Sequence, residues 1–393
     1  MLGVRLPGAR HVAAGPARLT SPVAARTGAP PTVNRRPFIK RVVGGAAAAG
    51  ATVAAPALAQ APERETFEWK LPTSFPAQAP GVGTNVTSFA ERVAAMSDGR
   101  LTFKVFSAGE LVPPFAVEDA VQQGTAEIGH SPPYYAAGKD PALHFFSTVP
   151  FGLSATEHAA WLRFGGGQAL WDEIYAERSL VPIYSGNSGV QSAGWFRKPV
   201  NSVADLDGLN MRIAGLGGEA MRELGVNATL LPPPEIFPAF KSGAIDAAEW
   251  VGPLLDQAFG LYKVSKLCYV PAFHEPGAAL EIVVNADAWA ELPEDLKAIV
   301  RNAAEATSVE TLAQFDWFNA RALGQLREEG VDFREFPEDV VAALREASAT
   351  VMDRIAKDSE SFSRVRESYE AYLASAKEYS SLFDGAMLRQ REG

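Results

Sequence analysis

The sequence is poor in the residues on which several kinds of chemistry depend. It has one cysteine, Cys268, and five histidines in 393 residues. A single cysteine excludes an intramolecular disulfide and a cysteine-based zinc or iron–sulfur cage. The chain also lacks the His-Glu-x-x-His zinc pair and the Gly-x-Ser-x-Gly nucleophile turn. Because Cys268 lies in the apolar stretch 267–271, we interpret it as a small buried hydrophobic residue.

Positive charge is scarce too, since the formal net charge is −10. Nucleic acid demands clustered lysine and arginine, so this balance argues against it as a partner. Beyond residue 59 no apolar run reaches the length that crosses a bilayer. With 47% hydrophobic and 21% charged residues, the composition is that of a folded globular protein.

Acidic residues are absent from residues 1–59, which hold eight lysines and arginines. Within them, the segment 34–40 reads Asn-Arg-Arg-Pro-Phe-Ile-Lys and precedes a weakly apolar run and Ala57-Leu58-Ala59. This order predicts a twin-arginine signal peptide that is removed after Ala59, and therefore a periplasmic protein. The remaining chain carries 28 basic and 46 acidic residues, a net charge of −18.

Apolar periodicity alternates between strand and helix in the first part of that chain. We expect strands at 67–71, 101–105 and 126–130, with helices at 86–96 and 117–123 between them. The same order returns later, with expected strands at 210–214, 228–231 and 244–250 and helices at 218–224 and 235–241. Two α/β domains of this kind predict a ligand cleft where they meet.

Past residue 286 the pattern is mostly helical, and it predicts long helices at 296–312, 315–329, 340–357 and 362–376. The expected division is a leader at 1–59, one α/β domain from 60–187 with 283–320, a second at 188–282, and C-terminal helices at 321–393. Those last helices pack either on their own chain or on a second copy in a homodimer, and the sequence leaves both alternatives open.

One motif favours an enzyme. Residues 215–220 fit Gly-x-Gly-x-x-Ala between a strand and a helix, and Glu235 follows where a ribose-binding acid could lie. Against this interpretation, Glu219 places a negative charge where a pyrophosphate would bind, and three prolines at 232–234 precede Glu235. An exported NAD(P)-dependent oxidoreductase is therefore the alternative from another functional class.

Other polar residues occur at strand ends. Arg212 interrupts an apolar strand, where it either pairs with a carboxylate or points to the solvent face. Glu249 and Trp250 follow a strand of small residues, so a carboxylate and a backbone carbonyl lie at its end. With the Gln191 amide and the Glu275 carboxylate, these oxygens are of the type that Na⁺ and Ca²⁺ prefer.

Several segments together resemble a known family, the periplasmic substrate-binding proteins of TRAP (tripartite ATP-independent periplasmic) transporters, of DctP type. The resemblance runs through most of the chain after the leader. Its segments are 115–124, Tyr134-Tyr135 with Gly138-Lys139, 151–153, 186–195, 207–213 and 243–250.

The resemblance implies two α/β domains, bridged by a long helix, that close on a carboxylate. It also implies that Arg212 pairs with that carboxylate. Gln191 and Trp250 stand where many members have an arginine and an Asn-Pro pair. Together with His-Glu-Pro-Gly at 274–277, these features resemble the subgroup that binds 2-oxo or 2-hydroxy monocarboxylates with a metal ion. In that subgroup Gln191, Glu249 and the Trp250 carbonyl would be metal ligands, with Glu275 as a fourth.

The same resemblance implies that the substrate oxygens would be bound by Asn187 and by Tyr134 or Tyr135, and that Gln191 and Trp250 also line the substrate. We therefore expect a receptor without catalysis, which binds a pyruvate-like acid with Na⁺ in preference to Ca²⁺ and delivers it to two membrane permease subunits. The alternative ligands are lactate, a branched 2-oxo acid or a dicarboxylate. Replacing Arg212 by alanine is expected to abolish binding and leave the fold intact.

Overall fold

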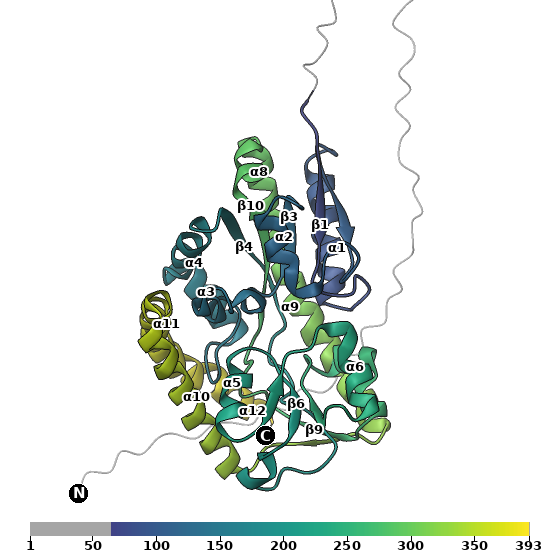
Figure 1. The fold of residues 1–393 in the computed structure, drawn as a ribbon, viewed down its shortest axis with the longest axis vertical. Helices are drawn as coiled ribbons and strands as arrows, with labels where there is room; N and C mark the ends of the chain where they lie inside the picture. The colour runs from purple at the N-terminus through teal and green to yellow at the C-terminus, as the bar shows by residue number, and fades with distance from the viewer. Residues whose placement is uncertain (1–63, 393) are drawn as a thin grey trace, which may run out of the picture. The chain divides into compact units, whose positions relative to one another are not determined.

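We name lobe one the part of the structure that contains strands β1 to β4 and β10 (Figure 1). The computed structural model describes residues 64–392, so the predicted leader at 1–59 lies outside the described residues. Strand β1 (Phe67–Pro72) pairs in parallel with β2 (Leu101–Phe106), and α1 (Val82–Met96) connects them. Strand β10 (Ala279–Asn285) pairs antiparallel with both β3 (Ile128–Ser131) and β4 (Leu180–Asn187). A parallel bridge from Thr73 to His130 joins the two groups.

A six-stranded sheet forms what we name lobe two. Its order is β11-β9-β5-β8-β6-β7, with β6 parallel to β7 and β8. The strands are short: β5 (Gly194–Phe196), β6 (Asn210–Arg212), β7 (Asn227–Thr229), β8 (Ala247–Ala248), β9 (Leu267–Tyr269) and β11 (Asp332–Arg334). The connecting helices are α5 (Gly215–Glu223), α6 (Pro233–Ser242) and α7 (Pro253–Phe259). The expected pair of α/β lobes is confirmed.

Short helices and turns fill most of the remaining connections. In lobe one these are η1 (Pro114–Ala116), α2 (Val117–Gln122), η2 (Pro133–Ala136), η3 (Pro141–Phe146), α3 (Ala155–Phe164), α4 (Gly167–Ala176) and α8 (Ala286–Glu291). In lobe two they are η4 (Val203–Leu206) and η5 (Leu261–Lys263). Phe146 stacks on Trp161 and Trp171, with ring centroids 5.8 and 5.1 Å apart, in a core that also contacts the C-terminal helices. Burying each such side chain contributes roughly 1.5–3 kcal/mol.

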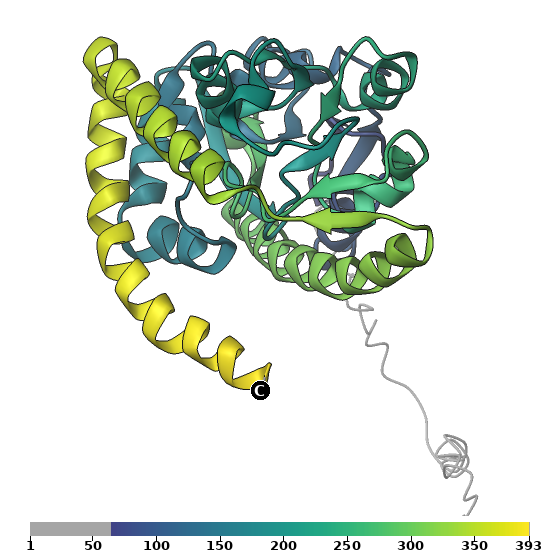
Figure 2. The ribbon, with the colours of Figure 1, turned by 90° about the horizontal axis from the view of Figure 1, so that it is seen from below.

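Two predicted elements differ from the structure. The expected helices at 296–312 and 315–329 are one helix, α9 (Glu294–Glu328), which is 35 residues long and runs along the lower right of the folded body in Figure 2. It packs on α1 and β4 of lobe one and on α7 of lobe two. Its buried face includes Thr307, Ser308 and Thr311, whereas Val309 and Trp317 are exposed, so hydropathy alone does not mark one continuous apolar stripe. The expected strand at 244–250 is limited to β8, since the Ala244 amide bonds back to the end of α6.

The C-terminal helices pack on their own chain over most of their length. Helix α10 (Glu338–Asp358) contacts α5, and α11 (Glu360–Ser380) contacts η3, α3 and α4. Beyond them, the π-helical turn η6 (Ser381–Gly385) and α12 (Ala386–Arg391) extend away from the lobes in Figure 2. Large apolar side chains are exposed on this last part and at the end of α11: Tyr379, Leu382, Phe383, Met387 and Leu388.

Within residues 64–392, no helix is long and apolar enough to cross a bilayer.

Candidate functional site

A buried ion pair lies at the carboxyl ends of two parallel strands of lobe two. Arg212 ends β6 and Glu249 follows β8, and each side chain is 1% exposed. The Arg212 Nη1 donates to Glu249 Oε2 at 2.5 Å and to the Glu249 carbonyl at 2.6 Å. The predicted inward position of Arg212 is therefore what the structure has. Carboxyl ends of parallel strands are where α/β sheets usually hold ligands.

A second buried carboxylate joins this pair. One ligand atom each of Glu249, His274 and Glu275 lies within 4.8 Å of the others, and all three residues are buried. The His274 Nε2 is 3.8 Å from Glu249 Oε1. Burial raises the pKa of Glu275 well above its usual range, Glu249 raises it further, and Arg212 and Tyr134 oppose the rise. Two carboxylates thus share one guanidinium in a region with little access to water.

Several oxygen atoms of this cluster have no hydrogen-bond partner within residues 64–392. These buried atoms are Gln191 Oε1, Glu249 Oε1, Glu275 Oε1 and Glu275 Oε2. The Gln191 amide nitrogen donates to Ser188 Oγ at 2.8 Å, which fixes the amide with its oxygen free. Its backbone nitrogen donates to the Glu275 carbonyl at 3.3 Å. Unpaired buried oxygens are costly, and a hard cation satisfies them.

The backbone at Trp250 passes beside the same cluster. The carbonyl before it, of Glu249, accepts from Arg212, and the carbonyl after it, of Val251, accepts from the Ser192 amide at 2.8 Å. Arg212 also lies over the Trp250 indole, with 5.5 Å between its Cζ and the ring centroid. Phe75 and Phe259 pack against that indole at 6.3 and 5.0 Å between centroids. An aromatic wall therefore lies next to the ion pair.

Lobe one contributes Tyr134 and Tyr135, which lie on η2 with ring centroids 5.2 Å apart. Burial raises the pKa of both hydroxyls. For Tyr134 the next cause is Glu275, and for Tyr135 it is Arg212, which acts in the opposite direction. Both side chains therefore lie close to the charged cluster. Because the two tyrosines are adjacent in the sequence, spacing alone could not decide which of them belongs to the site.

Asn187 ends β4, where the chain leaves lobe one. It is fully buried, its Oδ1 accepts from the Gly189 amide at 2.9 Å, and its Nδ2 has no partner in the described part of the chain. Gly277 lies against Asn187 Oδ1. The structure thus keeps one Asn187 donor available near the loop that carries Glu275.

Three residues beside the cluster were not predicted to belong to the site. His274 contributes to the buried group, Phe75 packs on Trp250, and Asp256 lies behind Val251 with a backbone hydrogen bond of 3.2 Å. The sequence offers a weak signal for His274, because it adjoins Glu275. It offers none for Phe75, which lies far from the others along the chain.

The glycine motif at 215–220 has a local structural role. Helix α5 already begins at Gly215, so Gly217 and Gly218 lie in its first turn. A Cβ on Gly217 would overlap the Cβ of His274. This glycine therefore lets the loop of His274 approach the helix, and that side of the turn is occupied by protein.

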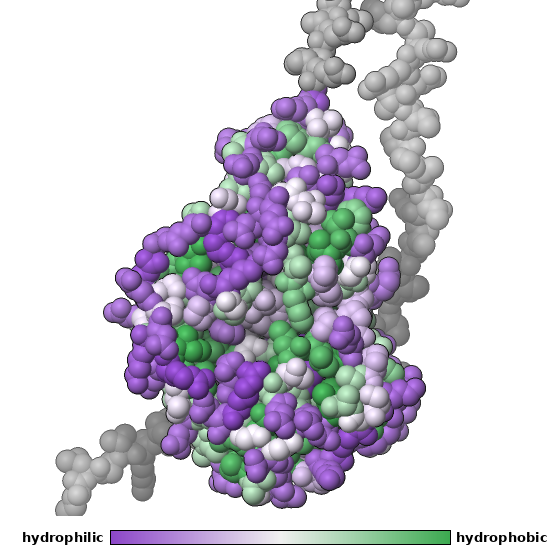
Figure 3. All heavy atoms as spheres, viewed as in Figure 1, coloured by the Kyte–Doolittle hydropathy of each residue, from purple (hydrophilic) through white to green (hydrophobic). Residues whose placement is uncertain are grey.

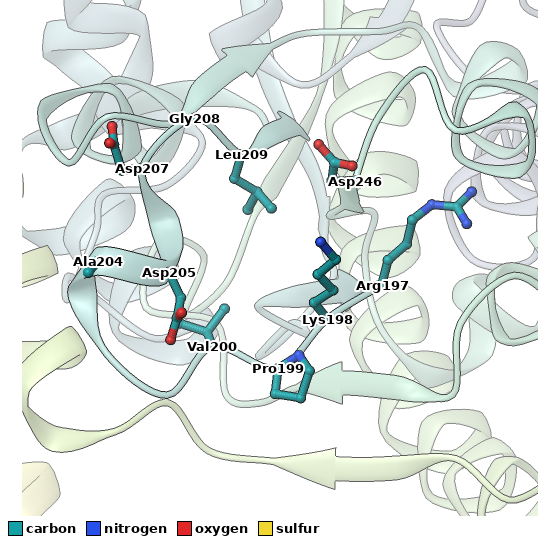
Figure 4. A pocket seen from close by; sticks show the side chains of 10 residues that line it. All are labelled: Arg197, Lys198, Pro199, Val200, Ala204, Asp205, Asp207, Gly208, Leu209 and Asp246. Atoms are coloured by element: carbon teal, nitrogen blue, oxygen red, sulfur yellow. The ribbon is translucent and has the colours of Figure 1, made fainter.

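Hollows elsewhere on the surface differ in character. A pocket of about 380 Å³, lined by the ten residues of Figure 4, includes Leu209 and Asp246, which precede β6 and β8, at the ends of these strands opposite Arg212 and Glu249. Another, of about 500 Å³, is lined by Tyr134 and Tyr135 of lobe one and by Gly215 and Arg222 of lobe two. Figure 3 shows a face that is largely hydrophilic, with hydrophobic patches near its centre.

Comparison with known proteins identifies the family. Residues 75–359 match the model of the bacterial extracellular solute-binding proteins, family 7, known as DctP. The chain belongs to this family. The resemblance to DctP-type receptors of TRAP transporters is thereby confirmed.

Three similar proteins illustrate what members bind. This family 7 protein is 42% identical over 304 residues to a monocarboxylate 2-oxoacid-binding periplasmic protein of Nostoc sp., covering 77% of this chain and 83% of that one. A TRAP solute-binding protein from Bordetella bronchiseptica, a mixed-occupancy dimer with calcium and picolinate, is 34% identical with a TM-score of 0.82, covering 84% and 98%. One from Pseudoalteromonas atlantica, with sodium and pyruvate, is 35% identical with a TM-score of 0.80, covering 83% and 99%.

Proposed function

We propose that this protein is the periplasmic receptor of a TRAP transporter and captures a small 2-oxo monocarboxylate, such as pyruvate, together with a metal ion. The observation that carries the proposal is the group of unpartnered buried oxygens of Gln191, Glu249 and Glu275 beside Arg212. A cation satisfies these oxygens, and the guanidinium is suited to a carboxylate. The Nostoc relative and the Pseudoalteromonas structure support the same ligand class.

In the proposed complex the ion is held by Gln191 Oε1, the Glu249 carboxylate, the Trp250 carbonyl and the Glu275 carboxylate. The ion supplies positive charge and draws in both the carboxylate and the 2-oxygen of the acid, which can chelate it together. We propose Na⁺ rather than Ca²⁺, because four protein ligands and two ligand oxygens make six, the lower limit of what Ca²⁺ usually takes. Arg212, Asn187 and the Tyr134 and Tyr135 hydroxyls bind the acid.

One guanidinium and an aromatic wall favour a monocarboxylate over a dicarboxylate. Arg212 is the cation that acts on Tyr134, Tyr135 and Glu275 alike. A second carboxylate on the ligand would face Phe75 and Trp250, which offer no counter-charge. Lactate and branched 2-oxo acids remain alternatives that differ in their 2-oxygen or in their side chain.

The proposed mechanism is closure of the two lobes without catalysis. Arg212, Glu249 and Trp250 belong to lobe two, Tyr134 and Tyr135 to lobe one, and Gln191 and Glu275 to the segments that pass between them. A ligand that contacts both lobes favours the closed state. In this proposal the crossings between the lobes follow β4 and precede β10; the domain division expected from the sequence, 60–187 with 283–320 and 188–282, stays a prediction, and its boundary at 282/283 falls within β10. The closed, loaded receptor would then deliver the acid to the two permease subunits.

Thermal-shift screening of residues 60–393 tests the ligand. Pyruvate, lactate, a branched 2-oxo acid, 2-oxoglutarate and NADP are each added with Na⁺, with Ca²⁺, and with neither ion. At 100 times its Kd, a native-state ligand stabilises the fold by about 2.7 kcal/mol. Pyruvate in the presence of Na⁺ is expected to give the largest shift. A shift with NADP and none with any acid would refute the receptor and support the oxidoreductase.

We also propose export by the twin-arginine pathway, on the basis of the basic leader with its Arg35-Arg36 pair. Changing both arginines to lysine keeps the charge and removes the planar guanidinium pair. The variant is expected to stay in the cytoplasmic fraction, whereas the wild-type chain is expected in the periplasmic fraction. Equal periplasmic amounts of the two would contradict the assignment.

The exposed apolar end of the chain supports a homodimer through the C-terminal helices. Tyr379 and Phe383 stack at 4.7 Å between ring centroids, and Leu382, Met387 and Leu388 are exposed beside them. We expect light scattering to give a dimer for the wild type and a monomer for Phe383→Glu with Leu388→Glu. An Arg391→Glu variant controls for added negative charge. A monomeric wild type at micromolar concentration would refute this interface.

A further inference from the structure

A buried carboxylate outside the proposed ligand set lies directly behind it. Asp256 is on α7 and is fully buried. Its Oδ2 accepts the indole N–H of Trp195 at 2.8 Å, and its Oδ1 accepts the backbone N–H of Val251 at 3.2 Å. Neither Asp256 nor Trp195 contributes a ligand atom to the site described above.

The Val251 N–H belongs to the same peptide unit as the Trp250 carbonyl. This peptide is trans, and in a planar trans peptide the N–H and the C=O point in opposite directions. When Asp256 binds the N–H, the Trp250 carbonyl is therefore directed to the other side of the backbone. That carbonyl is the one ligand of the proposed set that no side-chain torsion can aim.

The same segment is tied to the other proposed ligands. The Val251 carbonyl accepts the Ser192 amide at 2.8 Å, and the neighbouring Gln191 amide donates to the Glu275 carbonyl at 3.3 Å. Asp256 thus anchors a run of backbone hydrogen bonds that passes by Trp250, Gln191 and Glu275. Without Asp256, the Trp250–Val251 peptide loses the hydrogen bond that fixes its orientation.

A buried carboxylate at position 256 costs the fold stability that an apolar side chain would not. Burial raises its pKa to about 7, Glu249 raises it as well, and the hydrogen bonds from Trp195 and Val251 oppose the rise. Replacing buried ionisable groups by apolar residues of similar size is often neutral or stabilising. A role in holding the site accounts for a carboxylate here.

We propose that Asp256 is a positioning residue for cation capture, which holds the Trp250–Val251 peptide so that the Trp250 carbonyl faces the ion. This inference rests on the proposed metal-assisted binding of a 2-oxo acid. Outer partners of metal ligands commonly change metal affinity by about 10- to 100-fold when they are replaced.

The quantity to measure is the coupling ratio, the Kd of pyruvate without Na⁺ divided by its Kd at saturating Na⁺, by calorimetry. Asp256→Leu keeps the number and branching of the side-chain heavy atoms and removes the acceptor. Asp256→Asn combined with Trp195→Phe keeps an acceptor for the Val251 N–H and removes the second donor, which would oppose the new amide. Trp195→Phe alone is the matched control. A merely structural role would lower the melting temperature and leave the ratio unchanged.

We expect Asp256→Leu to lower the coupling ratio at least about 10-fold, and the double variant to stay within threefold of its Trp195→Phe control. A folded Asp256→Leu protein with the wild-type ratio would overturn the proposal. If that variant does not fold, the double variant decides, because a lost ratio there would show that the hydrogen bond is not what positions the carbonyl. A wild-type protein that binds pyruvate equally with and without Na⁺ would instead refute the proposed metal site, and this inference with it.

Discussion

Removing the Arg212 guanidinium is expected to damage the fold as well as binding. The side chain is buried and donates two hydrogen bonds to Glu249, at 2.5 and 2.6 Å. Breaking a buried ion pair by removing one partner costs about 3–5 kcal/mol, because the other charge stays buried. Glu275 loses the same counter-charge. The expectation from the sequence, that loss of Arg212 leaves the fold intact, therefore has to be revised.

The sharpest perturbation is Arg212→Met, which preserves much of the volume, compared with Arg212→Met combined with Glu249→Gln. The single variant should lose about 3–5 kcal/mol of unfolding free energy. The double variant should regain most of this loss, because Glu249 no longer leaves an unpaired buried charge; the remainder reflects Glu275, which still lacks Arg212. Denaturant unfolding in a buffer without Na⁺ and Ca²⁺ measures both values and keeps an ion from replacing the guanidinium.

Binding is expected to fail in both variants. The guanidinium makes charged hydrogen bonds with the acid, at about 1.5–3 kcal/mol each, so loss of two predicts a Kd for pyruvate that rises at least 100-fold. Arg334→Gln, which removes an exposed arginine paired with Asp332, is the control and should change neither quantity. Unchanged pyruvate affinity in Arg212→Met would refute the site, and an unchanged unfolding free energy would refute the reasoning about the ion pair.

Three further outcomes can be checked independently. Burial lowers the pKa of His158 to about 4. Below about pH 6.5 the unfolded chain takes up a proton that the folded chain does not, so the unfolding free energy of the wild type should fall relative to His158→Gln by about 1.4 kcal/mol per pH unit between pH 6.5 and 4. A constant difference between the two proteins in urea titrations would contradict this. Gly217→Ala should displace His274 and weaken pyruvate binding at least tenfold, whereas Gly324→Ala, which meets open space in α9, should bind normally and be more stable by roughly 1 kcal/mol; equal calorimetric affinities would show that the His274 loop tolerates the shift. Tyr135→Phe should raise the Kd of pyruvate about two- to tenfold, as expected for one neutral hydrogen bond, and an unchanged Kd would exclude its hydroxyl from the site.

Sequence patterns predicted the α/β lobes because strand and helix periodicities are local. They did not predict the continuity of α9, because its buried face carries Thr307, Ser308 and Thr311 while Val309 and Trp317 are exposed, which blurs the apolar periodicity. They also overextended the strand at 244–250, since turn hydrogen bonds at Ala244 override its apolar character.

The sequence likewise indicated some residues of the candidate site and not others. A charge inside an apolar strand is anomalous in the sequence itself, so Arg212 could be selected, and the structure places it against Glu249. Asp256 and Phe75 are ordinary in their local sequence, and only tertiary packing brings them to Val251 and Trp250. The metal and substrate roles of the selected residues stay predictions.

The single long helix has a mechanical consequence. Near its middle, α9 is fastened to lobe one through Thr311, which Asn85 contacts, and to lobe two through Asn319, whose side chain accepts the Leu254 amide at 2.9 Å. These attachments are eight residues apart, or about 12 Å along the axis. An unbroken helix does not fold at a joint, so relative rotation of the lobes is taken up as torsion and sliding within roughly two turns. The distance along α9 between its contacts with the two lobes therefore sets how far the lobes can rotate relative to each other.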